Sequence, residues 1–413
     1  MATIPSINEQ RPTPPASGSA GLLVSLGPLS HEALAVTLAN LAEAFPAQPV
    51  LVATPDHVSP DTPVAPHLEV VPYTPPAPTT SSWLLSAADY LNTWKLIDEH
   101  HAGACLLLGP EPQSLGPSAV RALAQAVVTQ HADLATPRYD LSPRDGLVNS
   151  AILFPVTRAL FATRSRYPLA VDLALSTRMA ERLATVAQRH TASGANAALV
   201  WPVPEAAVAG YSTVEVAAGS RALPPPGTID LNSVLAQVAG SFFAEVDAKA
   251  AFWQRARLSY PPRNGSSTQA QPLAHANGPE DTPDVAAMLD SFRLAYANLH
   301  EIWALVLPPN SLLGLKKLSQ LTTESLRMPD PLWARIVYDF ILAYRLRVLN
   351  RGHLLGALTP LYLAWVASHL LQTSAGAPDF ITPEKHIEAV ATAFEADKPY
   401  LVSRWRWPDR FNP

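Results

Sequence analysis

The first half of the chain alternates short apolar runs with amphipathic segments, an order typical of strands followed by helices. Residues 21–26 and 50–53 are continuous apolar runs, and between them apolar side chains recur at helical spacing from Leu34 to Phe45. This order predicts a right-handed β-α-β unit in a parallel sheet, because a helix must carry the chain back before the second strand can run parallel to the first.

The alternation continues up to about residue 230. Further apolar runs predict strands at 68–71, 104–108 and 133–136, and helices are predicted over about 82–100 and after Gly116-Pro117. Proline suits the first turn of a helix, where its missing N–H costs no hydrogen bond. We therefore predict an open α/β domain over 20–230, with helices on both faces of the sheet.

The second half of the chain has a helical pattern. We expect a connecting helix over 231–258, a linker over 259–283 and a helical C-terminal domain over 284–413, after an N-terminal tail over 1–19 that is predicted to be disordered. The helices of the C-terminal domain are predicted at about 284–306, 311–326, 330–350, 353–372 and 383–396.

One of these helices includes a nearly uncharged stretch, 354–371, whose 18 residues approach the roughly 20 needed to span a bilayer. Pro360 and Ser368 lie within it, and several basic residues precede it. A buried core helix and a membrane-embedded helix are both compatible with this pattern. We favour the core helix and expect no stable membrane insertion.

Composition excludes some classes of function. The formal net charge of −5 gives no electrostatic reason to expect nucleic acid as a partner. The single cysteine, Cys105, cannot form an internal disulfide, and the chain opens without a charged segment followed by an apolar one. A reducing, cytoplasmic location is therefore expected. The sequence does not indicate an oligomeric state.

Strong catalytic motifs are absent, so the predicted sheet directs the search for a site. Open α/β sheets bind ligands beyond the carboxyl ends of their strands. Asp56 and Glu111 are the acidic residues of the loops that follow the second strand and the strand at 104–108. Each is either a ligand for Mg²⁺ or Mn²⁺, which prefer oxygen, or an exposed turn residue.

Several segments resemble bacterial glycosyltransferases related to mannosylglycerate synthase. They are 133–139 (DLATPRY), 145–149 (DGLVN), 154–160 (FPVTRAL) and 166–176 (RYPLAVDLALS), joined by 331–340 and 351–362 in the helical part. The resemblance implies a GT-A fold, which is a Rossmann-like open mixed sheet with helices on both faces, followed by an all-α domain. It also implies hexose transfer from a nucleotide-diphosphate sugar to a small polar acceptor or a glycan.

Only some of the family's metal-binding residues have a counterpart in this sequence. Its Asp-x-Asp element falls on Gly109-Pro110-Glu111, so the resemblance assigns Glu111 to the metal and donor diphosphate. The family's metal-binding histidine is replaced by Ala222. The acid of its Gly-Gly-Asp/Glu element is kept as Asp172, which the resemblance makes the catalytic candidate.

A diphosphate leaving group needs positive charge to face it. One carboxylate and no histidine form a poor site for Mg²⁺ or Mn²⁺, so a divalent metal cofactor is left open. Arginine can bind phosphate without a metal, and it is also a common surface residue. The arginines near the expected site are Arg138, Arg144, Arg164, Arg166 and Arg221, and we assign Arg138, Arg166 and Arg221 to the donor.

The helical segments that resemble the family suggest an acceptor site. Its candidates are Arg335, Tyr338, Asp339 and His353, and a buried hydrogen-bond network that joins the helices is the alternative.

Two functions remain compatible with the sequence. One is a hexosyltransferase, and the other is a non-catalytic relative that keeps the fold as a binding or assembly module. The fold alone does not decide between them.

Overall fold

The computed structural model describes most of the chain. The described residues are 21–56, 58–59, 62–75, 83–142, 144–223, 230–255, 284–374, 377 and 380–408. The predicted tail over 1–19 and the predicted linker over 259–283 lie outside them.

The N-terminal half forms one seven-stranded mixed sheet with the strand order β3-β2-β1-β4-β6-β5-β7. The strands are β1 (Leu22–Leu26), β2 (Val50–Thr54), β3 (Leu68–Pro72), β4 (Ala104–Leu108), β5 (Leu134–Tyr139), β6 (Asp172–Ser176) and β7 (Thr213–Gly219). β6 pairs antiparallel with both β4 and β5, whereas β1, β2, β3 and β4 run parallel. The sheet is therefore mixed, as expected from the resemblance.

Helices cover both faces of the sheet. They are α1 (His31–Ala44), α2 (Ala87–His100), α3 (Pro117–Val128), α4 (Phe154–Phe161), α5 (Thr177–Ala192) and α6 (Pro202–Ala209), with a 3₁₀ turn η1 (Pro112–Ser114) and a π-helical segment η2 (Asn149–Leu153). Alternate strand residues point to opposite faces. Val24 and Leu106 pack with α1 and α3, while Leu23 and Cys105 pack with α2 and α5.

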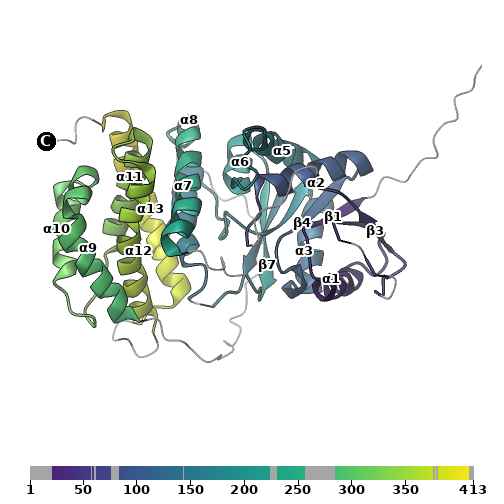
Figure 1. Cartoon of the computed structure of the whole chain (residues 1–413), viewed down its shortest axis with the longest axis horizontal. Helices are drawn as coiled ribbons and strands as arrows, with labels where there is room; N and C mark the ends of the chain where they lie inside the picture. The colour runs from purple at the N-terminus through teal and green to yellow at the C-terminus, as the bar shows by residue number, and fades with distance from the viewer. Residues whose placement is uncertain are drawn as a thin grey trace, which may run out of the picture.

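The C-terminal half is helical. Its elements are α7 (Leu231–Ala248), α8 (Ala250–Trp253), α9 (Val285–Val306), α10 (Pro309–Ser319), α11 (Asp330–Leu346), α12 (Arg351–Thr373) and α13 (Pro383–Arg406). α7 packs against α11 and α12, α13 packs directly against α4, and β7 is the edge strand on the side of this helical part (Figure 1). The predicted fold class, an open α/β sheet followed by helices, is confirmed.

The two halves share one continuous apolar core rather than touching at a wet interface. The Trp333 indole of α11 donates a hydrogen bond to the Ala151 carbonyl of η2 at 2.8 Å. Arg158 of α4 binds Glu388 and Glu395 of α13. Because these contacts combine apolar packing with buried hydrogen bonds, they fix the helices relative to the sheet.

α12 is the helix that contains the apolar stretch 354–371. It is the one described helix long and apolar enough to cross a membrane by length and composition, and 83% of its apolar window is buried inside the protein. The Trp303 indole of α9 donates to the Ala357 carbonyl of α12 at 2.9 Å, and the Trp333 ring stacks on that of Trp365. These contacts are those of a core helix.

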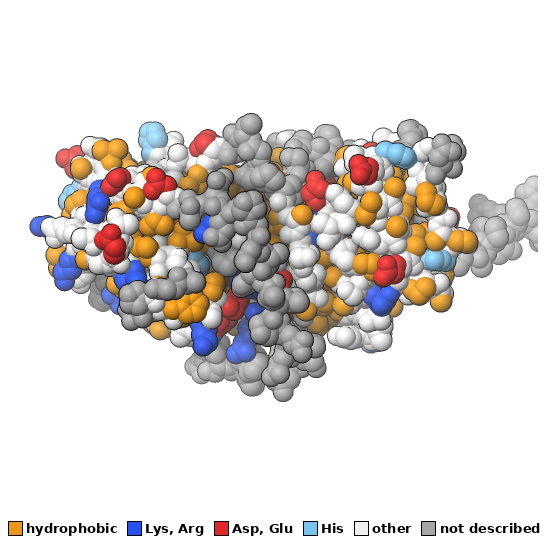
Figure 2. Space-filling view, turned by 90° about the horizontal axis from the view of Figure 1, so that it is seen from below, with side chains coloured by type: hydrophobic (Ala, Val, Ile, Leu, Met, Phe, Trp, Pro, Cys, Tyr) orange, Lys and Arg blue, Asp and Glu red, His pale blue; other side chains and the backbone are white. Residues whose placement is uncertain are grey.

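On the face seen in Figure 2, acidic and basic side chains are interspersed over the helical part.

Two histidines meet between α12 and α13. His369 Nδ1 lies 2.7 Å from His386 Nδ1, and His386 Nε2 lies 3.3 Å from Asp330 Oδ1. The two rings stack, and His369 also stacks on Trp365. Burial, then the neighbouring His386 and Arg166, lower the pKa of His369 from 6.5 to about 3.

We predict that Leu358→Ala lowers the free energy of unfolding by about 2–5 kcal/mol, because Leu358 of α12 is fully buried and its loss leaves a cavity. Urea denaturation of the full chain measures this. Leu305→Ala is the control, since Leu305 is 59% exposed and its truncation should change stability by less than about 0.5 kcal/mol. Equal effects of the two substitutions would contradict the assignment of α12 to the core.

We also predict that stability falls as the pH drops from about 6.5 towards 3. In this range the unfolded chain binds a proton at His369 that the folded chain does not. The free energy of unfolding therefore falls by up to about 1.4 kcal/mol for each pH unit that the pH is lowered. His369→Gln should reduce this slope in pH-dependent denaturation. His353→Gln, at an exposed histidine, should leave it unchanged. An unchanged slope in His369→Gln would refute the prediction.

Candidate functional site

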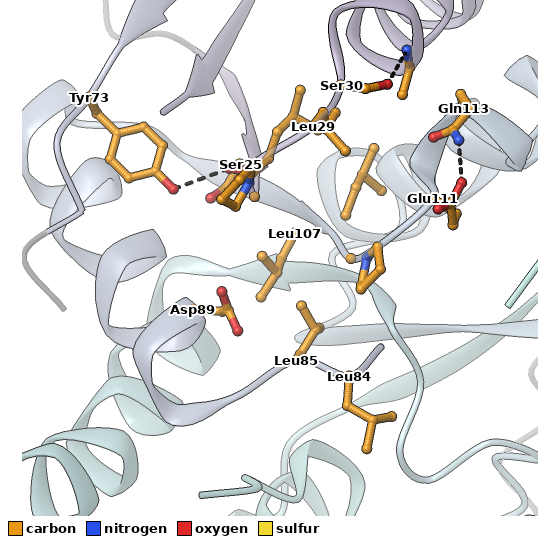
Figure 3. Close-up of a pocket in the computed structure, with 17 residues that line it drawn as sticks. Ser25, Leu29, Ser30, Tyr73, Leu84, Leu85, Asp89, Leu107, Glu111 and Gln113 are labelled. Atoms are coloured by element: carbon orange, nitrogen blue, oxygen red, sulfur yellow. Dashed lines mark hydrogen bonds between the residues drawn. The ribbon is translucent and has the colours of Figure 1, made fainter. Parts of the chain in front are cut away.

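A pocket opens where β1 and β4 end. β1 connects outward to β2 on one side, and β4 lies on its other side, so this is the topological switch point at which open α/β sheets bind ligands. The cavity has a volume of about 260 Å³. Its described lining comes from 25–30, Ala33, Tyr73, Leu84, Leu85, Asp89, 107–111 and Gln113. Figure 3 shows Tyr73 and Asp89 on one side of it and Glu111 and Gln113 on the other.

The wall at Tyr73 is held by hydrogen bonds. Burial, then the Asp89 and Asp56 carboxylates, raise the pKa of Tyr73, so its hydroxyl stays protonated and donates to the Leu26 carbonyl at 3.1 Å. Asp89 accepts from the backbone N–H and the hydroxyl of Ser86, both at 2.7 Å, in the capping box that begins α2.

The loop after β4 contains Gly109. In the resemblance described above, Gly109 stands at the position of the first aspartate of the Asp-x-Asp element. A Cβ built on Gly109 would lie 2.4 Å from the carbonyl oxygen of Val171 and 2.9 Å from its Cβ. Because real Cβ atoms do not approach backbone oxygen so closely, no side chain fits at 109 with the backbone in this position. The close approach of Val171, just before β6, therefore explains why position 109 carries no carboxylate side chain.

Glu111 lies on the pocket side of the same loop. Its backbone is left-handed, with φ of 57°, and its exposed carboxylate accepts a hydrogen bond from the Gln113 amide. It is a boundary residue of the 3₁₀ turn η1.

Asp172 begins β6 and is fully buried. Its Oδ2 accepts from the Tyr139 hydroxyl and from Arg221 Nε, both at 2.8 Å, and its Oδ1 accepts from Arg221 Nη2 at 3.0 Å. Burial, then the Asp172 charge, raise the pKa of Tyr139 well above its ordinary value. Tyr139 therefore remains a neutral donor to the carboxylate.

Arg221 follows β7 and completes a bidentate ion pair whose two side chains are both 0% exposed. Its Nη2 donates to the Pro110 carbonyl at 2.7 Å, and its Nη1 donates to the Ser114 hydroxyl at 2.7 Å and to the Glu111 carbonyl. Burial acts to lower the pKa of Arg221, but the Asp172 carboxylate outweighs it, so the pKa is raised. Arg221 is a fixed cation that fastens the loop after β4 to the sheet.

The residues at this edge do not fit a divalent metal ion. Gly109 and Ala222 carry no ligand atom, and the Asp172 oxygens are already bound by Tyr139 and Arg221. Of the residues that the resemblance assigns to a metal, this leaves the exposed Glu111 carboxylate. Across the described residues, no cluster of three or more His, Cys, Asp or Glu side chains is placed to hold a metal.

The remaining donor candidates lie elsewhere. Arg138 of β5 is partly exposed and pairs with Glu384 of α13 at 2.8 Å. Arg166 is buried, with its guanidinium over the rings of Phe154 and Tyr167 and its Nε 3.6 Å from Glu384. The structure thus brings Glu111, Asp172 and Arg221 together, and places Arg138 and Arg166 where the sheet meets α13.

The acceptor candidates join helices. Arg335 pairs with Asp397 on the surface, and the Tyr338 hydroxyl donates to the Phe394 carbonyl at 2.7 Å. Asp339 accepts from Arg404 Nη1 at 2.7 Å and from the Tyr400 hydroxyl. These contacts bind α11 to α13. His353 is exposed in the first turn of α12.

Sequence reasoning did not single out Tyr139 or Ser114, which contact Asp172 and Arg221. Tyr139 lies three residues beyond the strand predicted at 133–136 and ends β5; its place in the segment 133–139, which carries the resemblance, was the available signal. Nothing in the sequence indicates that Ser114 faces Arg221.

Comparisons with known proteins give a limited result. No protein-family model matches the sequence, and no curated protein matches it. Among solved structures, glucosyl-3-phosphoglycerate synthase from Mycobacterium tuberculosis in complex with phosphoglyceric acid has 14% identity and a TM-score of 0.34 over 56% of this chain and 80% of that one.

The same enzyme in complex with Mn²⁺, uridine diphosphate and glucosyl-3-phosphoglycerate has 16% identity over the same shares of the two chains, again with a TM-score of 0.34. A structure described as a mycobacterial protein has 14% identity and a TM-score of 0.35, over 55% of this chain and 75% of that one. Similarity at this level has no bearing on the activity of the present chain.

We predict that Arg221→Ala lowers the free energy of unfolding by about 3–5 kcal/mol, because it leaves the Asp172 carboxylate buried without its cation. Arg221→Lys should restore only part of the loss, since an ammonium cannot make the bidentate contact. Chemical denaturation measures both. Arg138→Ala, which breaks a half-exposed pair, should change stability by at most about 1 kcal/mol. If Arg221→Ala lowers the free energy of unfolding no more than Arg138→Ala does, the pair of Arg221 and Asp172 is not a structural anchor.

Proposed function

We propose that this chain is a non-catalytic relative of nucleotide-sugar transferases that retains the pocket at the switch point as a ligand-binding site. The observation that carries the proposal is the fully buried pair of Arg221 and Asp172. In this pair, the two residues that a transferase of this kind would direct at its substrate are bound to each other.

The contacts of Arg221 argue against sugar transfer. A departing diphosphate must be met by positive charge, and the Arg221 donors are directed at Asp172 and at acceptors of the loop 110–114. To reach a substrate, either member of the pair would have to leave the other buried and alone. Breaking such a pair costs about 3–5 kcal/mol.

The pocket supports a retained binding role. It lies beyond the carboxyl ends of β1 and β4, which is where the fold places ligands, and it remains open beside the closed Arg221 edge.

Hexose transfer from a nucleotide-sugar donor to a small polar acceptor is the competing function. It would require Glu111 to hold a divalent ion almost alone, and Arg335, Tyr338 and Asp339 to give up their contacts with α13 to meet an acceptor. The expected cytoplasmic location fits either function and remains a prediction.

The proposal is tested by incubating the purified chain with UDP- and GDP-sugars and small hydroxy acids, with Mn²⁺ or with EDTA. We expect no nucleoside diphosphate release and no glycosylated product in either condition. Thermal shift in the same mixtures reports binding, because a ligand of the folded state raises the melting temperature.

The control is Glu99→Gln, at the end of α2 that is far from the pocket. Mn²⁺-dependent turnover that this variant keeps and that Glu111→Ala abolishes would establish the transferase instead.

A further inference from the structure

The outer end of the helical part carries exposed leucines. Leu294 and Leu305 of α9 are 65% and 59% exposed, and Leu313 of α10 is 52% exposed, which makes them the three most exposed leucines of the described residues. α9 and α10 form the end of the helical part that lies farthest from the sheet (Figure 1). Single exposed leucines are common on monomers, but several on neighbouring helices indicate a surface that binds another protein.

α9 is apolar on two opposite faces. Leu294 and Leu305 are eleven residues apart, which is close to three turns, so they lie on one face of the helix, and the exposed Ala297 lies on the same side. Phe292 and Trp303 have the same spacing, lie on the opposite face and are fully buried. A helix that is apolar all round is one that is covered all round. The outer face of α9 therefore has the composition of a face that a partner covers.

The outer faces of α9 and α10 carry charges of opposite sign. Asp290 and Glu301 are exposed on the outer side of α9, and Asp290 pairs with Arg293 of the same helix at 3.2 Å. Lys316 and Lys317 are exposed in the last turn of α10. Within the part of the chain that the structure describes, Glu301 and the two lysines form no ion pair. They are available to a partner.

Opposite charges on adjacent helices make this surface complementary to a second copy of itself. When a twofold axis relates two copies, α9 of each copy can face α10 of the other, and every contact occurs twice. Glu301 of each copy then meets the α10 lysines of the other, while the exposed leucines exclude water from the centre. Two helices of like charge would instead repel their copies.

The size of the surface indicates a reversible contact. α9 has 22 residues and α10 has 11, which at about 1.5 Å per residue and a width of about 10 Å gives roughly 500 Å² on each copy. Two copies would then bury about 1,000 Å², which is the lower end for a specific interface. Association through this surface should therefore depend on concentration.

We propose that two copies of this chain associate through the outer faces of α9 and α10. The exposed leucines form the apolar centre of the contact, and Glu301 of each copy pairs with the α10 lysines of the other. This inference does not depend on the function of the pocket, which lies in the α/β half.

Sedimentation velocity of the full chain over a range of concentrations tests the inference. We expect a monomer–dimer equilibrium in which Leu294→Lys raises Kd about tenfold or more, because it places a cation in the apolar centre, opposite the α10 lysines. Val128→Lys is the matched control, since Val128 is 39% exposed on α3 in the α/β half and should leave the equilibrium unchanged. Both substitutions are at exposed positions, and an unchanged far-UV circular dichroism spectrum shows that the variants fold.

An exchange of charges tests which helices face each other. Glu301→Lys alone, and Lys316→Glu combined with Lys317→Glu, should each weaken self-association, because like charges then meet. An equimolar mixture of the two variants should regain the dimer, because every contact again joins opposite charges. Glu99→Lys, at an exposed position of α2, is the control and should not change association.

Three results would overturn the inference. A chain that stays monomeric up to about 100 μM has no such contact, and a basic segment of a different protein is then left as the occupant of the α9 face. A dimer that Leu294→Lys does not weaken uses another surface. A mixture of the charge variants that associates no better than either variant alone excludes the pairing of α9 with α10.

Discussion

The buried pair of Arg221 and Asp172 is the interaction on which the loop edge of the sheet depends. Asp172 belongs to β6, which is antiparallel to its neighbours, and Arg221 follows β7 beyond β5. Their contact joins the start of β6 to the end of β7 and, through the Pro110 and Glu111 carbonyls, fixes the loop after β4. A carboxylate and a guanidinium can be buried together only when nearly all their hydrogen-bonding atoms are satisfied, and here they are.

A second constraint acts in the same direction. Val171 approaches Gly109 so closely that no side chain fits there, and Val171 immediately precedes the carboxylate that Arg221 binds. The absence of a side chain at 109 and the burial of the cation at 221 therefore follow from one packing arrangement. A carboxylate at 109 would require the backbone at 171 to move.

In the helical part, the residues considered for acceptor binding hold helices together. The residues that the sequence suggested for acceptor binding instead connect α11 with α13, and Trp333 and Arg158 fasten these helices to η2 and α4. The pocket at the ends of β1 and β4 lies in the α/β half, away from these contacts.

The sequence by itself determined the order of elements and the edge of the sheet at which to look. The spacing of apolar residues along a strand or a helix follows from the local geometry of that element. The strands up to Tyr139 and the helices after Asp284 could therefore be predicted from this spacing. It did not reveal β6 or β7 as strands, because Asp172-Leu-Ala-Leu-Ser176 contains good helix formers and becomes extended only between two partner strands. The pairing of Arg221 with Asp172, the approach of Val171 to Gly109 and the acidic lining of the pocket join residues dozens of positions apart. Such contacts depend on strand order and register, which only the tertiary structure decides.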